Sequence, residues 1–174
     1  MENEHKQILD KIKDIEILKL LKSEAEMALD ESIASQTIIT DKANTIFQIL
    51  IVILFSILGF LVSKFPDIEI NSPIIKISLF LIIVCSCSIW FLLKIIYPNL
   101  TYSKGTTPSK LLHSDIFIKD WEEISILKNR IYNLDKAIKE NKIFQSNRIY
   151  HFKTAIYILL IGILLTTLYS LCII

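Results

Sequence analysis

Residues 43–62 read ANTIFQILIVILFSILGFLV, a run of 20 residues without a charged side chain. A second run is free of charge over 17 residues, at positions 77–93, and the last 21 residues, 154–174, carry no charge either. A helix crosses about 30 Å of hydrocarbon with roughly 20 apolar residues. The three runs therefore predict three transmembrane helices, at residues 43–62, 74–96 and 154–174.

The composition argues against a water-soluble enzyme. Hydrophobic residues make up 52% of the chain, and three Gly and four Pro are too few for a turn-rich β fold or a glycine-rich phosphate loop. The three histidines are scattered, and no nucleophile stands beside a base at a catalytic spacing. We therefore predict an all-α integral membrane protein, with no catalytic residues, no metal site and no cofactor.

The distribution of basic residues predicts the orientation. Residues 1–42 contain six Lys and residues 97–153 contain ten Lys and Arg, whereas the short loop at 63–73 contains only Lys64. Basic residues accumulate on the cytoplasmic side of membrane proteins. We expect the N-terminus and residues 97–153 in the cytoplasm. Because residues 154–174 form the third span, the C-terminus is expected on the outside.

Two amphipathic helices are expected in the cytoplasmic parts, because apolar residues recur there at steps of three and four. The first helix is expected over residues 5–35, with the apolar residues Ile8, Ile12, Ile15, Leu18, Leu21, Ala25 and Leu29. The second starts near Asp115 and continues, with one break near Asn141, into the third span; its apolar residues are Phe117, Trp121, Ile124, Leu127, Ile131, Leu134 and Ile138. Residues 1–42 carry a net charge of −4 and residues 97–153 one of +4. The two helices either pack together as a small cytoplasmic helical bundle or are separately solvated.

Polar and small residues within the spans predict helix packing. Asn44 and Gln48 lie four residues apart on one face, and amides in lipid require hydrogen-bond partners. Gly162, Thr166 and Ser170 form a stripe of small residues at the same spacing, which lets two helices approach closely. The stripe serves packing either within one chain or between the protomers of a homo-oligomer. No charge lies in the middle of a span, which argues against ion-coupled transport.

Basic residues gather toward the membrane end of the second amphipathic helix. Three explanations remain open for them: positive-inside anchoring, contact with anionic lipid headgroups, and a site for a phosphate-bearing ligand. The residues concerned are Lys128, Arg130, Lys136, Lys139, Lys142, Arg148 and Lys153.

Several short motifs resemble the transmembrane effectors of bacterial Pycsar anti-phage systems. Residues 41–44, DKAN, open the first span, and Tyr97-Pro98 follows the second. The segment PSKLLHSDI at 108–116 is similar to an element of that family, although Lys110 stands where the family has Asn. A long basic helix then leads into the last span. The resemblance covers about residues 25–172. SLATT-type membrane effectors have the same arrangement of a helix and two spans and are an alternative family.

The resemblance implies a non-enzymatic effector in the bacterial inner membrane. Such a protein responds to a cyclic pyrimidine mononucleotide, cyclic UMP or cyclic CMP, made by a partner cyclase after infection. It then forms a homo-oligomer in the lipid bilayer and impairs the membrane, which causes abortive infection; nucleic acid is not a partner. For the activating nucleotide, Lys128, Arg130 and Arg148 are the expected phosphate contacts, and Trp121 or Tyr132 would stack on the base. The alternatives are a non-enzymatic membrane scaffold and a holin-like toxin that needs no ligand.

Overall fold

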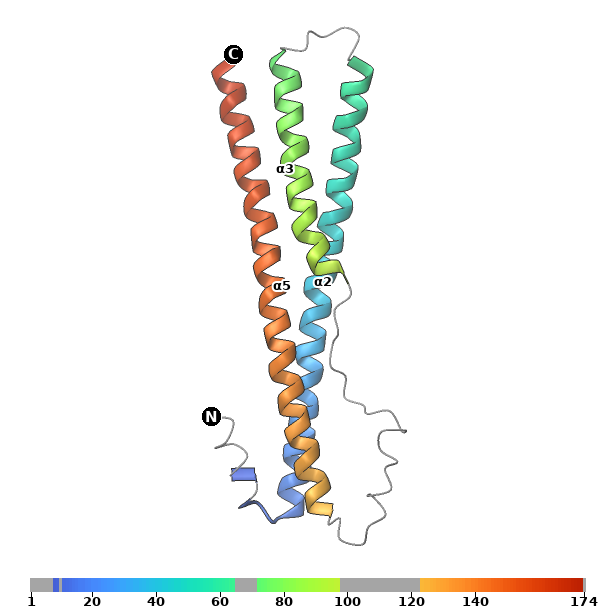
Figure 1. Cartoon of the computed structure of the whole chain (residues 1–174), viewed down its shortest axis with the longest axis vertical. Coiled ribbons are helices and arrows are strands. Elements are labelled where there is room, and N and C mark those ends of the chain that lie inside the picture. The colour runs from blue at the N-terminus through green and yellow to red at the C-terminus, as the bar shows by residue number, and fades with distance from the viewer. Residues whose placement is uncertain (1–7, 10, 65–71, 98–122, 174) are drawn as a thin grey trace. The chain divides into compact units, whose positions relative to one another are not determined.

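The computed structural model describes residues 8–9, 11–64, 72–97 and 123–173. Three long helices account for most of them: α2 (Ile15–Lys64), α3 (Pro73–Ile96) and α5 (Glu123–Ile173) (Figure 1). Each is long and apolar enough to cross a membrane. The described residues therefore bear out an all-helical fold with three candidate spans.

Helix α2 begins where Asp14 provides an N-terminal cap. The Asp14 carboxylate accepts hydrogen bonds from the backbone N–H groups of Glu16, at 2.9 Å, and Ile17, at 3.5 Å. Such a cap satisfies backbone donors that have no partner inside the helix. From there α2 runs without interruption for 50 residues. The predicted amphipathic helix and the first span are thus parts of one helix.

Helix α3 is delimited by proline at both ends. Pro73 occupies the first turn, where a missing N–H costs nothing, and the helix ends at Ile96. Tyr97 still donates its N–H to the Leu93 carbonyl at 2.9 Å. The next residue in the sequence is Pro98, and a residue that precedes proline disfavours the helical conformation.

Helix α5 is also continuous, so the predicted break near Asn141 is wrong. Asn141 is fully buried, and it belongs to a series of buried residues that recur at intervals of seven. The series comprises Leu134, Asn141, Arg148, Ala155 and Gly162. A heptad repeat keeps one face of a helix against its neighbour. Because the seven-residue spacing of buried residues is maintained, α5 continues through the polar residues Asn141 and Arg148 without a break.

The chain divides into two compact units, which are described separately. The amphipathic unit comprises the described residues up to Gln36 together with residues 123–145. The span unit comprises residues 37–64, 72–97 and 146–173. Helices α2 and α5 each contribute residues to both units.

In the amphipathic unit, α2 and α5 run parallel to each other. Lys19 Nζ lies 3.5 Å from the Glu123 carboxylate, and seven residues further along both helices Glu26 Oε1 lies 3.8 Å from Arg130 Nη2. Gln36 then donates a hydrogen bond to the Asn141 carbonyl at 3.1 Å. Contacts that advance in the same direction on both helices define a parallel pair. The oppositely charged segments thus pack together instead of being separately solvated.

In the span unit, the three helices lie side by side (Figure 1) around a small core. The core consists of Ala43, Leu50, Cys85, Leu92, Ile95 and Ala155, with further apolar side chains packed against it. Most of the apolar surface nevertheless faces outward. Within the most apolar 18-residue stretch of each helix, the buried share is only 6% in α2, 22% in α3 and 11% in α5. Exposed apolar surface on this scale is unfavourable in water and suits contact with lipid, which indicates a membrane protein.

Candidate functional site

The most unusual polar residue of the span unit is Arg148. Arg148 is only 7% exposed, and its guanidinium Nη1 donates a hydrogen bond to Thr40 Oγ1 of α2 at 3.2 Å. Its Nε atom is buried and has no hydrogen-bond partner. Within the described residues, no carboxylate lies at ion-pair distance from this guanidinium. Arg148 therefore holds a buried positive charge that is not neutralised by the described residues.

The heptad series explains why this arginine is buried. Arg148 lies seven residues after Asn141 and seven before Ala155, so the register of α5 turns it toward the other helices. Ala43 of α2, like Ala155, is fully buried, and such small side chains let helices approach closely. The nearby Lys153 does not belong to the series and is exposed. The position on the helix, and not the basic character of the segment, thus selects Arg148 for burial.

An unneutralised buried charge is energetically costly. Leaving one member of a buried ion pair without its partner costs about 3–5 kcal/mol. Thr40 offers only a neutral hydroxyl, which compensates part of the lost hydration. An anion that reached the guanidinium would recover the rest through charge-assisted hydrogen bonds. The geometry thus suits Arg148 to binding a phosphate or carboxylate group.

A second buried polar contact lies within the amphipathic unit. Gln36 is 2% exposed and Asn141 is fully buried, and the Gln36 side-chain N–H donates to the Asn141 backbone carbonyl. Ser32, one turn earlier on α2, is also buried, and its hydroxyl has no partner. Buried polar residues in a heptad stripe lower stability and specify the register of the helices. These residues favour one alignment of α2 with α5.

The five predicted nucleotide contacts fall in different parts of the chain. Arg130 is paired with Glu26, and Lys128 and Tyr132 are half-buried in the amphipathic unit, where each also has partners of its own. Arg148 belongs to the span unit. Trp121 lies outside the described residues. Of the predicted cations, Arg148 is the one whose described surroundings leave its charge unneutralised.

The predicted packing residues differ in their surroundings. Asn44 is half-buried and Gln48 is exposed, and neither makes a hydrogen bond to another helix within the described residues. Gly162 is buried against α3, where a Cβ atom would lie 2.4 Å from Val84 Cγ1. The hydroxyls of Thr166 and Ser170 donate to carbonyls of their own helix. The close approach that the stripe predicts is thus found at Gly162, within one chain.

Three interhelical hydrogen bonds among the described residues use Gln36 and Thr40 of α2, which are not predicted contacts, and Ser88 of α3. They are Gln36 with Asn141, Thr40 with Arg148, and Ser88, whose hydroxyl donates to the Ala155 carbonyl at 3.4 Å. The heptad of α5 locates the partner in each contact, namely Asn141, Arg148 and Ala155, and a heptad of α2 locates Gln36. Counting in sevens from Leu29 leads through Gln36 to Ala43 and Leu50, and all four residues are buried.

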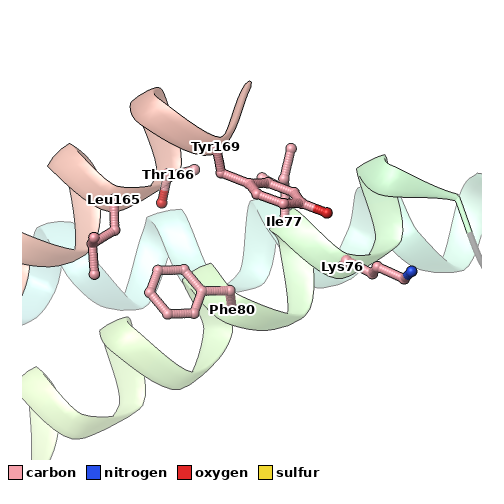
Figure 2. Close-up of a pocket in the computed structure, with 6 residues that line it drawn as sticks. All are labelled: Lys76, Ile77, Phe80, Leu165, Thr166 and Tyr169. Atoms are coloured by element: carbon pink, nitrogen blue, oxygen red, sulfur yellow. The ribbon is translucent and has the colours of Figure 1, made fainter. Parts of the chain in front are cut away.

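A groove between α3 and α5 lies near the beginning of α3. It has a volume of about 360 Å³ and is lined by Lys76, Ile77, Phe80, Leu165, Thr166 and Tyr169. Figure 2 shows the Tyr169 ring extending from α5 toward α3, with its hydroxyl directed toward the end of the groove where Lys76 lies. The lining is almost wholly apolar, with a single charged residue, so the groove lacks the convergent polar groups that a polar ligand requires.

Comparison with protein-family models, with curated proteins and with solved structures finds no match for this chain. No group of three or more His, Cys, Asp or Glu side chains that would hold a metal ion occurs among residues 8–9, 11–64, 72–97 and 123–173. The candidate site therefore rests on the chemistry of the chain itself. Its principal element is the buried charge of Arg148.

Proposed function

We propose that the protein is a membrane effector of an anti-phage defence system of the Pycsar type. A cyclic pyrimidine mononucleotide, cyclic UMP or cyclic CMP, triggers it in the bacterial inner membrane, with the N-terminus in the cytoplasm and the C-terminus outside. The triggered chains oligomerise and impair the membrane. The motifs at residues 41–44 and 108–116 supply the family resemblance, and three apolar helices supply the means of acting on a bilayer.

The observation that carries the proposal is the unneutralised buried charge of Arg148. A cyclic mononucleotide has one phosphodiester group with a single negative charge, which is the chemical complement of one guanidinium. Arg148 lies six residues before the predicted start of the third span, on the same continuous helix. An anion bound there acts directly on a helix that continues into the membrane.

Continuous helices also supply the mechanical connection. Neither α2 nor α5 contains a linker between its amphipathic part and its apolar part. A ligand shifts an equilibrium only by the difference between its affinities for the two states. A change from 1:99 to 99:1 requires about 5.5 kcal/mol of such difference. Relief of a buried charge worth about 3–5 kcal/mol would provide much of it.

The test is dye uptake by bacteria that express the protein with a pyrimidine nucleotide cyclase. We expect uptake with an active cyclase and none with a catalytically inactive one. Arg148→Met should abolish the response, because methionine replaces the apolar stem of the arginine side chain and offers no charge to the nucleotide. Lys153→Met is the matched control, since Lys153 is an exposed cation near Arg148 on the same helix, and it should respond like the parent protein.

The same strains distinguish the alternatives. A holin-like toxin would admit dye without any cyclase. A membrane scaffold would admit none in any strain. An Arg148→Met variant that still responds to the active cyclase would refute the role of Arg148 while leaving the effector function in place.

A further inference from the structure

A second groove between α3 and α5 lies at the opposite end of α3. It has a volume of about 500 Å³, and its lining residues are Trp90, Leu93, Lys94, Tyr97 and His151. We refer to these five residues as the Lys94 groove. Trp90, Leu93 and Lys94 lie on the last two turns of α3, and Tyr97 follows its last residue; the spacings of three and four place these side chains on one face. The groove thus combines aromatic rings, an apolar side chain and a cation on one continuous surface.

Among the residues that the structure describes, none supplies a counter-charge to Lys94. Its ammonium lies 5.8 Å from the centre of the Trp90 ring and 5.5 Å from that of Phe91. Those rings supply weak cation–π attraction, and no carboxylate lies at ion-pair distance within the described residues. Helix α3 contains no Asp or Glu, so an anion that pairs with Lys94 cannot come from the same helix.

The described residues of the span unit are strongly unbalanced in charge. Helix α5 contributes no acidic residue to this unit, and Asp41 of α2 is its one described acid. Against it stand six basic residues: Lys42, Lys64, Lys76, Lys94, Arg148 and Lys153. Asp41 cannot neutralise them all, so the described part of the unit carries a net positive charge that anions at its surface would balance.

The exposed aromatic residues indicate where in a bilayer this groove lies. Trp90 is 62% exposed and Tyr97 is 73% exposed, and they flank Lys94 at the end of a candidate span. Trp and Tyr concentrate at the level of the lipid headgroups, and a Lys near a helix end directs its ammonium to the same level. Leu93 and Trp90 continue the groove toward the apolar part of α3, where an acyl chain would lie.

We propose that the Lys94 groove binds an anionic phospholipid. The Lys94 ammonium pairs with the phosphodiester of the headgroup, Tyr97 lies beside it, and Trp90 and Leu93 contact the acyl chain. The bound lipid supplies the negative charge that α3 and the span-unit part of α5 lack. This site is distinct from the nucleotide contact proposed at Arg148 and is independent of it.

Trp90 itself reports the occupancy of the groove. The chain contains two Trp residues, so Trp121→Phe leaves Trp90 as the single indole. The full chain is reconstituted in phosphatidylcholine vesicles that contain either brominated phosphatidylglycerol or brominated phosphatidylcholine at the same mole fraction. Bromine quenches a tryptophan that it contacts, so the ratio of the two quenching efficiencies gives the relative affinity for the anionic lipid. One basic residue at a membrane surface predicts a preference of about fivefold.

Substitutions identify the source of that preference. Lys94→Gln should reduce it to about onefold, and Lys94→Arg should preserve it, because only the charge is required. Lys76→Gln is the matched control: it removes a cation from the other end of the same helix and should leave the fivefold preference intact. Helicity measured by circular dichroism verifies that each variant is folded.

Two results would overturn the proposal. The first is equal quenching by the two brominated lipids in the parent protein, or a preference that Lys94→Gln leaves unchanged. The second is a saturable change in Trp90 emission on adding cyclic UMP to phosphatidylcholine vesicles, abolished by Lys94→Gln, without any lipid preference; the groove would then be a nucleotide site. Neither result bears on the dye-uptake response attributed to Arg148.

Discussion

Gly162 is the position at which the packing of α3 against α5 can be tested most sharply. A Cβ atom on Gly162 would lie 2.4 Å from Val84 Cγ1, 2.8 Å from Val84 Cγ2 and 3.1 Å from Val84 Cβ. These distances are well below the contact distance of about 3.5–4.0 Å between carbon atoms. Gly162→Ala therefore forces either the valine or the two helices to move.

The magnitude follows from two opposing effects. Inserting a methyl group into a packed site costs about 1–3 kcal/mol. Alanine also favours the helix over glycine, by about 1 kcal/mol. The single substitution should therefore destabilise the protein by roughly 0–2 kcal/mol, the difference of these two effects. Because that range includes zero, the coupling with Val84 is the more decisive quantity.

A double-mutant cycle isolates the steric effect. Val84→Ala removes both Cγ atoms that the new methyl group would meet, so Gly162→Ala should be tolerated in that background. We expect a favourable coupling of about 1–3 kcal/mol between the two substitutions, within the range seen for residues in contact. The measurement is the reversible unfolding of the four proteins in mixed micelles on titration with a denaturing detergent, followed by circular dichroism.

Gly59 provides the matched control. It lies in the apolar part of α2, and a Cβ atom there would meet nothing within 4 Å. Gly59→Ala should therefore be neutral or stabilising, with no coupling to Val84→Ala. If Gly162→Ala and Val84→Ala prove additive to within about 0.5 kcal/mol, the close approach of α3 and α5 is refuted.

Three further predictions concern α2 and α5. Arg148→Met should stabilise the ligand-free protein by about 1–4 kcal/mol in the same unfolding titration, because it removes a buried charge that no described carboxylate neutralises. The exposed Lys153→Met should change stability by less than about 0.5 kcal/mol, and a strongly destabilised Arg148→Met would instead mark the arginine as structural. Asp14→Ala should cost the start of α2 about 1 kcal/mol, seen as faster hydrogen exchange at the amides of Glu16 and Ile17, and unchanged exchange there would contradict the cap. Glu26→Gln and Arg130→Gln should couple by about 0.2–1 kcal/mol at low salt, since the pair is partly exposed, and a coupling that does not weaken in high salt would argue against an ion pair.

Much of the fold is predictable because apolar run length is a local property. The charge-free runs at 43–62 and 77–93 fall within α2 and α3, and the run at 154–174 falls within α5 up to residue 173, the last that the structure describes. The predicted apolar face of the first amphipathic helix includes Leu18 and Leu29, which are fully buried, but also Leu21, which is 37% exposed. Steps of three and four identify a helix face approximately, and the partner helix decides which residues on that face are covered.

The sequence does not predict the continuity of α2, and it predicts that of α5 only with a break near Asn141; the reason is physical. The first amphipathic helix is predicted to end at residue 35, just before Gln36, and a break is predicted near Asn141. In the structure both are buried in the heptad stripe, where the Gln36 side-chain N–H donates to the Asn141 carbonyl of the parallel helix. That pairing joins residues 105 apart in the sequence, and no local pattern reveals it.

The candidate site shows the same distinction. Arg130 and Arg148 belong to one basic cluster in the sequence, and their charges are equal. They differ because Glu26, 104 residues away from Arg130, neutralises one of them, while Thr40 offers the other only a hydroxyl. Counting basic residues locates the segment, and three-dimensional pairing decides which cation remains available for an anion.

The most direct test of the proposed function is release of a self-quenched dye from phosphatidylglycerol-containing vesicles that hold the purified full-length protein. A gated effector retains the dye until cyclic UMP or cyclic CMP is added, and then releases it with a saturable dependence on nucleotide concentration. The Arg148→Met protein should retain the dye at every concentration, and Lys153→Met should behave as the parent does. Release before any nucleotide is added, or no release with either nucleotide, would contradict the proposal that a cyclic pyrimidine mononucleotide gates this protein.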